Sequence, residues 1–178
     1  DVYKRQLYLD MDGVLCNFDK AYRAFDPEKS DSKRFRHAVL DYHIFEDLEF
    51  MPDAQELLNY VSKLDNIKVE ILTSVGTFDV IQANAAKYQK TAWLNKNNIP
   101  YPPNFSRNKI EKAKYATPTS ILVDDSIGCV NPFTEAGGHG ILHTSSKETI
   151  LLLSSTISQI RASVSYTHLR AHETKANL

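Results

Sequence analysis

Several residue types that would mark a specialised class of protein are scarce in this chain. It has only two cysteines, Cys16 and Cys129, which are too few for a disulfide framework and show no metal-ligand spacing. No apolar run approaches the roughly 20 residues that a membrane-spanning helix needs. The net charge is −1, so the composition does not favour binding to a nucleic-acid polymer or a membrane surface. The opening residues DVYKRQ are not followed by the apolar stretch of a signal peptide. We therefore expect a cytoplasmic protein.

What is present is an ordinary globular composition. The chain has 178 residues, of which 42% are hydrophobic and 24% are charged, and this length suits one domain with a sizeable core. We expect that domain to span residues 7–162 and to carry a small inserted cap at about 15–50. Residues 1–6 and 163–178 resemble strings that recur at the ends of unrelated sequences, so we expect both segments to be non-native extensions.

Apolar runs alternate with helical patterns along most of the chain. Strands are predicted at 7–10, 68–74, 104–106, 120–125 and 140–144. Helices are predicted at 14–25, 53–64, 85–97, 108–116, 130–138 and 147–160, and we expect Tyr88 and Trp93 of the third helix to be core residues. This alternation predicts an α/β fold, with a Rossmann-like parallel sheet and helices on both faces. The charge-dense stretch 26–38 fits a small helical cap inserted after the first strand.

Three of the predicted strands end in polar side chains, which are Asp10 with Asp12, Thr73 with Ser74, and Asp124 with Asp125. Ligands of a parallel sheet bind at the carboxyl ends of its strands, so neighbouring strands would bring these groups together. Four carboxylates would repel each other by roughly 4 kcal/mol per close pair at an effective dielectric constant near 20. A divalent cation would remove this repulsion, and oxygen ligands favour Mg²⁺. The simpler alternatives are that the first Asp pair stabilises a turn and that Thr73-Ser74 caps a helix.

The same strand ends carry a family resemblance. DMDGVL at 10–15 resembles the first motif of the haloacid dehalogenase superfamily of phosphohydrolases, ILTS at 71–74 its second motif, and ILVDD at 121–125 its fourth. Within the superfamily, the chain is most similar to the 5'(3')-deoxyribonucleotidase branch, including short members from phages and bacteria. That likeness adds Phe18, an aromatic-rich segment at 45–54 and a KY....W helix at 87–93, and it covers roughly residues 7–145.

The resemblance implies a role for each acidic side chain. Asp10 would be the nucleophile that forms an aspartyl-phosphate. Asp12 would protonate the leaving alcohol and then deprotonate the attacking water, and its backbone carbonyl would face the metal. The expected Mg²⁺ ligands are Asp10, Asp12, Asp124 and Asp125.

The resemblance also implies the groups that hold the substrate. Thr73 would contact a phosphate oxygen and take part in catalysis, with Ser74 beside it, and Phe18 would line the substrate pocket. The third motif of the superfamily is a lysine before the acidic strand, and the segment NKIEKAKYA offers three candidates, which are Lys109, Lys112 and Lys114. We favour Lys112 as the motif lysine and Lys109 as a second substrate-binding group.

Together these features predict a Mg²⁺-dependent phosphomonoesterase of the 5'-nucleotidase type, acting on a small phosphate ester such as a nucleoside monophosphate. The predicted cap is shorter than that of the animal deoxyribonucleotidases, so their base and sugar preferences do not carry over. Two alternatives stay open. The protein could be a phosphatase for another small ester, or a non-catalytic module that binds a nucleotide or phosphate.

Overall fold

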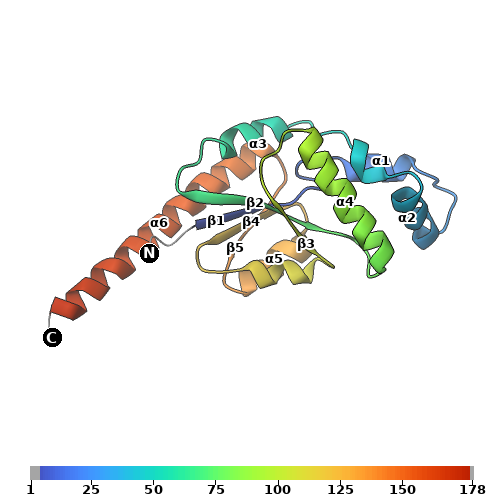
Figure 1. Cartoon of the computed structure of the whole chain (residues 1–178). Coiled ribbons are helices and arrows are strands. Elements are labelled where there is room, and N and C mark those ends of the chain that lie inside the picture. The colour runs from blue at the N-terminus through green and yellow to red at the C-terminus, as the bar shows by residue number, and fades with distance from the viewer. Residues whose placement is uncertain (1–4, 177–178) are drawn as a thin grey trace.

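The computed structural model describes residues 5–176 and shows a five-stranded, all-parallel sheet (Figure 1). The strands are β1 (Arg5–Leu9), β2 (Ile67–Ser74), β3 (Pro103–Ser106), β4 (Ser120–Asp124) and β5 (His139–Leu142). Their order is β3-β2-β1-β4-β5, so β1 lies in the centre and pairs with both β2 and β4. Its successive residues Leu7, Tyr8 and Leu9 are all buried, as a strand covered on both faces requires. The predicted α/β class is confirmed.

Two helical layers cover the sheet, and the alternation of side chains along β1 assigns residues to each. Leu7 and Leu9 belong to the larger core, which is closed by α3 (Ala54–Val61), α4 (Val80–Lys96) and α6 (Ser146–Ala176). Tyr8 belongs to a smaller core on the opposite face, closed by α5 (Ile127–Glu135) and the 3₁₀ segment η2 (Ile110–Tyr115). In Figure 1, α3 and α6 lie above the sheet and α5 lies below it.

Three short helical segments lie between β1 and α3, which are α1 (Phe18–Ala24), α2 (Asp31–Leu40) and the 3₁₀ segment η1 (Ile44–Asp47). The inserted chain returns beside its starting point, because Met51 N donates to the Leu15 carbonyl and Asn17 N donates to the Glu49 carbonyl. Asn17 also caps α1 by accepting a hydrogen bond from Lys20 N. The inserted segments α1, α2 and η1 form the cap. The cap leaves the sheet and returns to it at neighbouring points, and it lies beyond the carboxyl ends of the strands (Figure 1).

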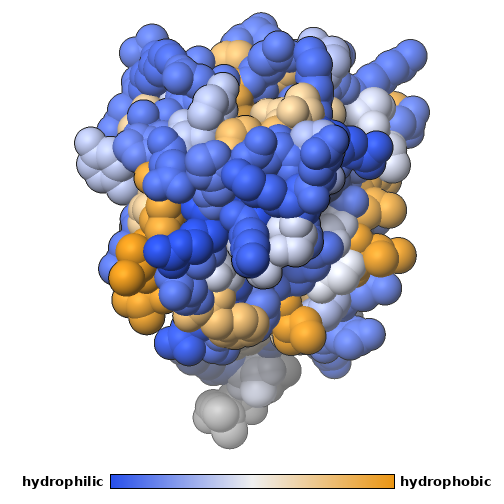
Figure 2. Space-filling model, turned by 90° about the vertical axis from the view of Figure 1, so that its right-hand side faces the viewer, coloured by the Kyte–Doolittle hydropathy of each residue, from blue (hydrophilic) through white to orange (hydrophobic). Residues whose placement is uncertain are grey.

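Helix α4 differs from its sequence prediction in both start and orientation. It begins at Val80 rather than at 85, because Asp79 caps it by accepting from Gln82 N. Trp93 is buried as expected, but Tyr88 is 73% exposed, so its prediction as a core residue was wrong. Figure 2 shows the side of the molecule that lies on the right in Figure 1, and this side is mostly hydrophilic, with its apolar residues in separate groups.

The two ends of the described chain also differ from the predicted elements. β1 begins at Arg5, which is the partner of Ile67, so the sheet includes residues 5 and 6. Helix α6 continues past the predicted end at 160 to Ala176, although its buried residues stop at Ile160 (Figure 1). Good helix formers such as Ala, Leu, Arg and Glu sustain a helix without an apolar face. Residues 1–4 and 177–178 lie outside the described residues. Within 5–176, none of the helices has both the length and the apolar character needed to cross a bilayer.

Candidate active site

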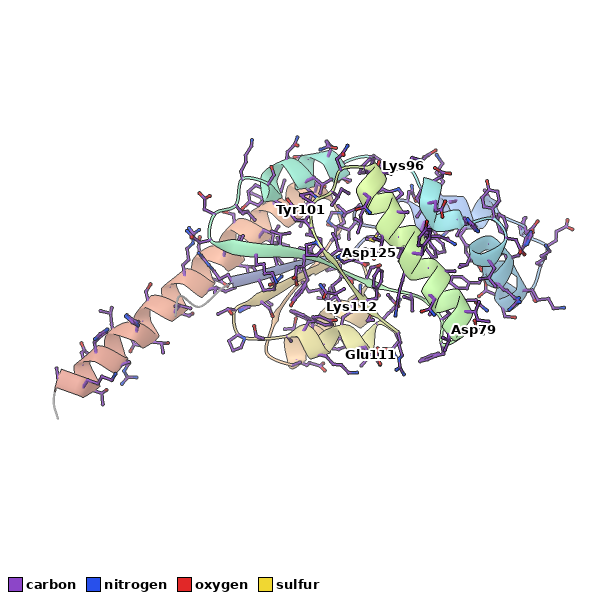
Figure 3. The ribbon with its side chains drawn as sticks, in the orientation of Figure 1. Asp79, Lys96, Tyr101, Glu111, Lys112 and Asp125 are labelled. Atoms are coloured by element: carbon purple, nitrogen blue, oxygen red, sulfur yellow. The ribbon has the colours of Figure 1, made fainter. Side chains whose placement is uncertain are left out.

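The predicted polar strand ends meet at one edge of the sheet. Since β1 lies between β2 and β4, Asp10 just after β1, Thr73 in β2 and Asp124 at the end of β4 converge there. A cleft of about 580 Å³ opens at this edge, and its lining includes Asp10, Asp12, Phe18, Ser74, Lys109, Lys112, Asp124 and Asp125. Figure 3 shows the labelled Lys112 and Asp125 at this end of the sheet, toward α4 and the cap.

Lys112 joins the two buried carboxylates of the site. Its Nζ lies 2.9 Å from Asp10 Oδ1 and 2.6 Å from Asp124 Oδ2, and the other oxygen of Asp124 accepts from Ser126 N at 2.9 Å. Of the other candidate lysines, Lys109 is exposed and lines the cleft, whereas Lys114 is exposed and pairs with Glu111. Lys112 is therefore the candidate that the fold brings into contact with Asp10.

Burial and the charge of the partner residues shift the pKa values of Asp10 and Lys112 in opposite directions. Burial raises the pKa of Asp10 to about 7, while the positive charge of Lys112 opposes that rise and the neighbouring carboxylates add to it. Burial alone would lower the pKa of Lys112, but the attraction of Asp10 and Asp124 outweighs it, so its pKa is raised and it stays an ammonium. Burial, followed by the charge of Asp124, raises the pKa of Asp125.

Asp12 has a separate set of partners. Its Oδ2 accepts from Lys90 Nζ at 2.7 Å, and its Oδ1 lies 3.4 Å from the thiol of Cys16. Burial raises the pKa of Cys16 well above its usual value, so this thiol stays protonated and donates. The same Lys90 Nζ donates to the hydroxyl of buried Thr73 at 2.8 Å. Asp12 and Thr73 are thus linked through one lysine.

Sequence reasoning missed Lys90. It located the helix but assigned the inward face to Tyr88 and Trp93, because apolar residues are the usual guide to burial. Gln89 and Lys90 are buried instead, and Tyr88 is exposed. The available signal was spacing, since Lys90 stands three residues before Trp93 and so shares its helical face.

The acidic residues fit a hard cation. One carboxylate oxygen from each of Asp10, Asp124 and Asp125 lies within 4.8 Å of the others, and an all-oxygen donor set suits Mg²⁺. The carboxylate of Asp12 is engaged by Lys90 and Cys16 and lies outside this group of three, so the expected contact of its backbone carbonyl with the metal stays a prediction. Within the described residues, the acidic side chains at this edge outnumber the two buried lysines that contact them, and a divalent ion would offset the remaining negative charge.

Gly13 permits the close approach of the first motif to Asp125. Its φ is +80°, a conformation that L residues other than glycine rarely adopt. A Cβ at this position would lie 2.0 Å from Asp125 Oδ2. An alanine therefore could not fit unless the Asp125 carboxylate moved out of the acidic group.

Replacing Gly13 with Ala should weaken Mg²⁺ binding by about tenfold or more, because displacing a ligand or its support typically costs that much affinity. Isothermal titration calorimetry with Mg²⁺ measures this. Gly137→Ala is the matched control, since Gly137 has a φ of +96° with nothing within 4 Å of the added Cβ. Both variants should lose about 1–2 kcal/mol of stability from the left-handed backbone. Equal Mg²⁺ affinity in the two variants would contradict the role of Gly13.

An aromatic cavity of about 320 Å³ adjoins the cleft, and its lining includes Asp12, Phe18, Phe35, Phe45, Ser74 and Phe78. Phe18 stacks between Tyr22 and Phe45, with ring centroids 5.1 and 5.0 Å away. Phe18 and Ser74 line both spaces, although the Ser74 hydroxyl already accepts from Gly76 N at 3.2 Å. The predicted substrate residue Phe18 thus lies where the cleft passes into the cap.

The similarity of this chain to known proteins lies in its fold. No family model matches it, and no curated protein matches its sequence. It resembles a hydrolase from Streptococcus pneumoniae TIGR4, with a TM-score of 0.53 and 15% identity over 85% of this chain and 99% of that one. It also resembles the D,D-heptose 1,7-bisphosphate phosphatase of Burkholderia thailandensis, with a TM-score of 0.51 and 13% identity over 85% and 99%. A haloacid dehalogenase-like family protein from Streptococcus pneumoniae overlaps with a TM-score of 0.46 and 14% identity over 78% and 83%. The first two matches show a shared fold.

Proposed function

We propose that the chain is a Mg²⁺-dependent phosphomonoesterase that forms an aspartyl-phosphate on Asp10. The observation that carries this proposal is the division of the carboxylates at the sheet edge. Asp10 lies with Lys112 in an all-oxygen cation site, while Asp12 faces the same cleft with partners of its own. The motif resemblance to haloacid dehalogenase phosphohydrolases supports it, as does the fold shared with a hydrolase and a phosphatase.

The first step transfers the phosphoryl group to the protein. When bound, Mg²⁺ would be held by Asp10, Asp124 and Asp125 and would offset the charge between the phosphate and the carboxylates. Lys112 orients Asp10 and favours its ionised, nucleophilic form, because its positive charge opposes the effect of burial on the pKa. As the bond from phosphorus to the ester oxygen breaks, Asp12 gives its proton to that oxygen, and the alcohol leaves.

The second step regenerates the enzyme. Asp12, now a carboxylate, takes a proton from a water molecule that attacks phosphorus, so the Asp10 carboxylate and inorganic phosphate are released and Asp12 is protonated again. The Thr73 hydroxyl accepts from Lys90, and since Thr73 is fully buried and is not among the residues that line the cleft, its part in this scheme is to hold that lysine. Each residue ends the cycle as it began.

The substrate that this site favours is a nucleoside monophosphate. The phosphate would occupy the cleft, and the base would enter the aromatic cavity that Phe18 and Phe45 line beside it. Aromatic faces stack on planar bases of any sequence, whereas a sugar offers no comparable face. This cavity favours a nucleotide over another small phosphate ester.

The test is phosphate release with Mg²⁺ from nucleoside 5'-monophosphates, hexose phosphates and 4-nitrophenyl phosphate, with EDTA as the metal-free control. We expect turnover that EDTA abolishes, and a kcat/KM about 5- to 150-fold higher for the nucleotides, which corresponds to one base-stacking contact of about 1–3 kcal/mol. Faster turnover of hexose phosphates would leave the chemistry standing and overturn the nucleotide preference. Phosphate release from none of the esters would favour the non-catalytic module.

A further inference from the structure

Lys90 is a buried lysine whose three donor contacts all lie at the candidate active site. Its side chain is 1% exposed, and its Nζ donates to Asp12 Oδ2 at 2.7 Å, to Thr73 Oγ1 at 2.8 Å and to the Ser74 carbonyl at 2.9 Å. An ammonium group has three protons, so these acceptors use its full donor capacity. A buried lysine without such partners would be strongly unfavourable, so the three acceptors explain why α4 carries a charge on its inward face.

The residues around Lys90 link the acidic side chains of the cleft to the cap. The ring of Phe45 lies 4.7 Å from Nζ and covers the ammonium from the cap side. Phe45 is positioned by the residue next to Lys90, because Gln89 Oε1 accepts from Phe45 N at 3.4 Å and Gln89 Nε2 donates to the Val39 carbonyl at 2.7 Å. Two successive residues of α4 therefore have two roles. Gln89 positions Phe45 at the aromatic cavity, and Lys90 binds Asp12.

The Asp12 carboxylate is fixed by two donors on different oxygens. Lys90 occupies Oδ2 with a charge-assisted hydrogen bond, whereas the donor that the described residues offer to Oδ1 is the weak Cys16 thiol at 3.4 Å. Oδ1 is thus the oxygen that is free to exchange a proton with substrate or water. The hydroxyl of buried Thr73 in β2 accepts a second hydrogen bond from Lys90 and so fixes the position of the ammonium group beside Asp12.

We propose that Lys90 is a positioning residue that holds Asp12 for proton transfer through Oδ1, while the Thr73 hydroxyl and the Ser74 carbonyl fix the lysine in place. This role rests on the proposed phosphomonoesterase function and deepens it. Lys90 contacts neither phosphorus nor the leaving oxygen in this scheme, and it acts on the reaction through Asp12. Its removal should therefore affect most strongly the step that needs the proton of Asp12, which is the departure of a poor leaving group.

The test compares two esters in a Lys90→Met variant, which keeps an unbranched apolar side chain of nearly the same length and removes the ammonium group. For a nucleoside 5'-monophosphate, whose alcohol must be protonated to leave, kcat/KM should fall about 100-fold or more, a typical contribution of general acid catalysis. For 4-nitrophenyl phosphate, whose leaving group is stable as an anion, kcat/KM should fall less than about tenfold. A rapid-quench experiment with the nitrophenyl ester should also show a burst, because the second step still needs Asp12 as a base.

The control variant is Lys87→Met, which removes an exposed lysine one turn earlier on the same helix and should leave both kcat/KM values unchanged. Equal losses for the two esters in Lys90→Met would show a merely structural role and overturn the proposal, as would the same selectivity in Lys87→Met. If Lys90→Met fails to fold, Lys90→Gln is judged by the same ratio of losses. No turnover of either ester by the wild-type protein would instead overturn the proposed function, and the role of Lys90 with it.

Discussion

An Asp10→Asn variant should lose phosphate release by at least about 10⁴-fold, the scale seen when a nucleophile is removed. The amide keeps the shape of the side chain but cannot form the aspartyl-phosphate. The variant should stay folded, because burial raises the pKa of Asp10 and so disfavours its charged form in the metal-free protein. Initial rates at saturating Mg²⁺ and substrate measure the loss, and thermal unfolding checks the fold.

The matched control for this variant is Asp65→Asn, which neutralises an exposed aspartate just before the start of β2, at the opposite end of the sheet from the cleft. It should retain wild-type rates. Acid quenching during turnover, followed by mass measurement, should reveal one covalent phosphoryl group on the wild-type protein and on the Asp65→Asn control. Turnover by Asp10→Asn near the wild-type rate would rule out a covalent intermediate on this residue.

A Lys112→Met variant should be destabilised by about 3–5 kcal/mol at pH 8 without metal, the usual cost of leaving a buried charge unpaired. Methionine fills similar space, but the buried carboxylates of Asp10 and Asp124, now 2.9 and 2.6 Å from a lysine, would face each other without a cation. Urea unfolding measures the loss. Lys114→Met removes an exposed lysine of the same segment and should change the free energy of unfolding by less than about 0.5 kcal/mol.

The cost of Lys112→Met should shrink as the pH falls. In the metal-free wild-type protein, the raised pKa of Asp10, about 7, means that the folded state binds a proton which the unfolded state releases above about pH 4. Stability from this group therefore falls as pH rises toward 7. Without Lys112 to oppose burial, the pKa of Asp10 rises further, so the variant continues to lose stability at pH values above 7, where the loss from this group in the wild-type protein levels off. Two results would contradict this account. One is a loss in the free energy of unfolding that is the same at pH 5 and pH 8, and the other is a loss that neither acid nor a second substitution, Asp124→Asn, reduces.

The agreement between sequence and structure is best where the signal is local. The alternation of apolar residues located all five strands, and the polar residues at the ends of β1, β2 and β4 predicted a convergence that the strand order confirms. Asp10 and Asp124 could be placed at one edge because in a parallel sheet every strand finishes on the same side. The choice among the three lysines was harder, because they lie within six residues, with Lys109 just before the short 3₁₀ segment η2 and the other two on it. Only the packing of η2 against α5 separates buried Lys112 from exposed Lys109.

By itself the sequence determined the sheet, the order of its elements and the acidic residues at their ends, since these depend on short periods and on neighbouring residues. The tertiary structure decided which cations meet those acids. Lys90 lies 78 residues from Asp12 along the chain, and a lysine on the inward face of α4 contradicts the hydrophobic pattern that predicts burial. Its burial is tolerable only because Asp12, Thr73 and the Ser74 carbonyl accept its three protons. Those acceptors come together only when β1, β2 and α4 have packed.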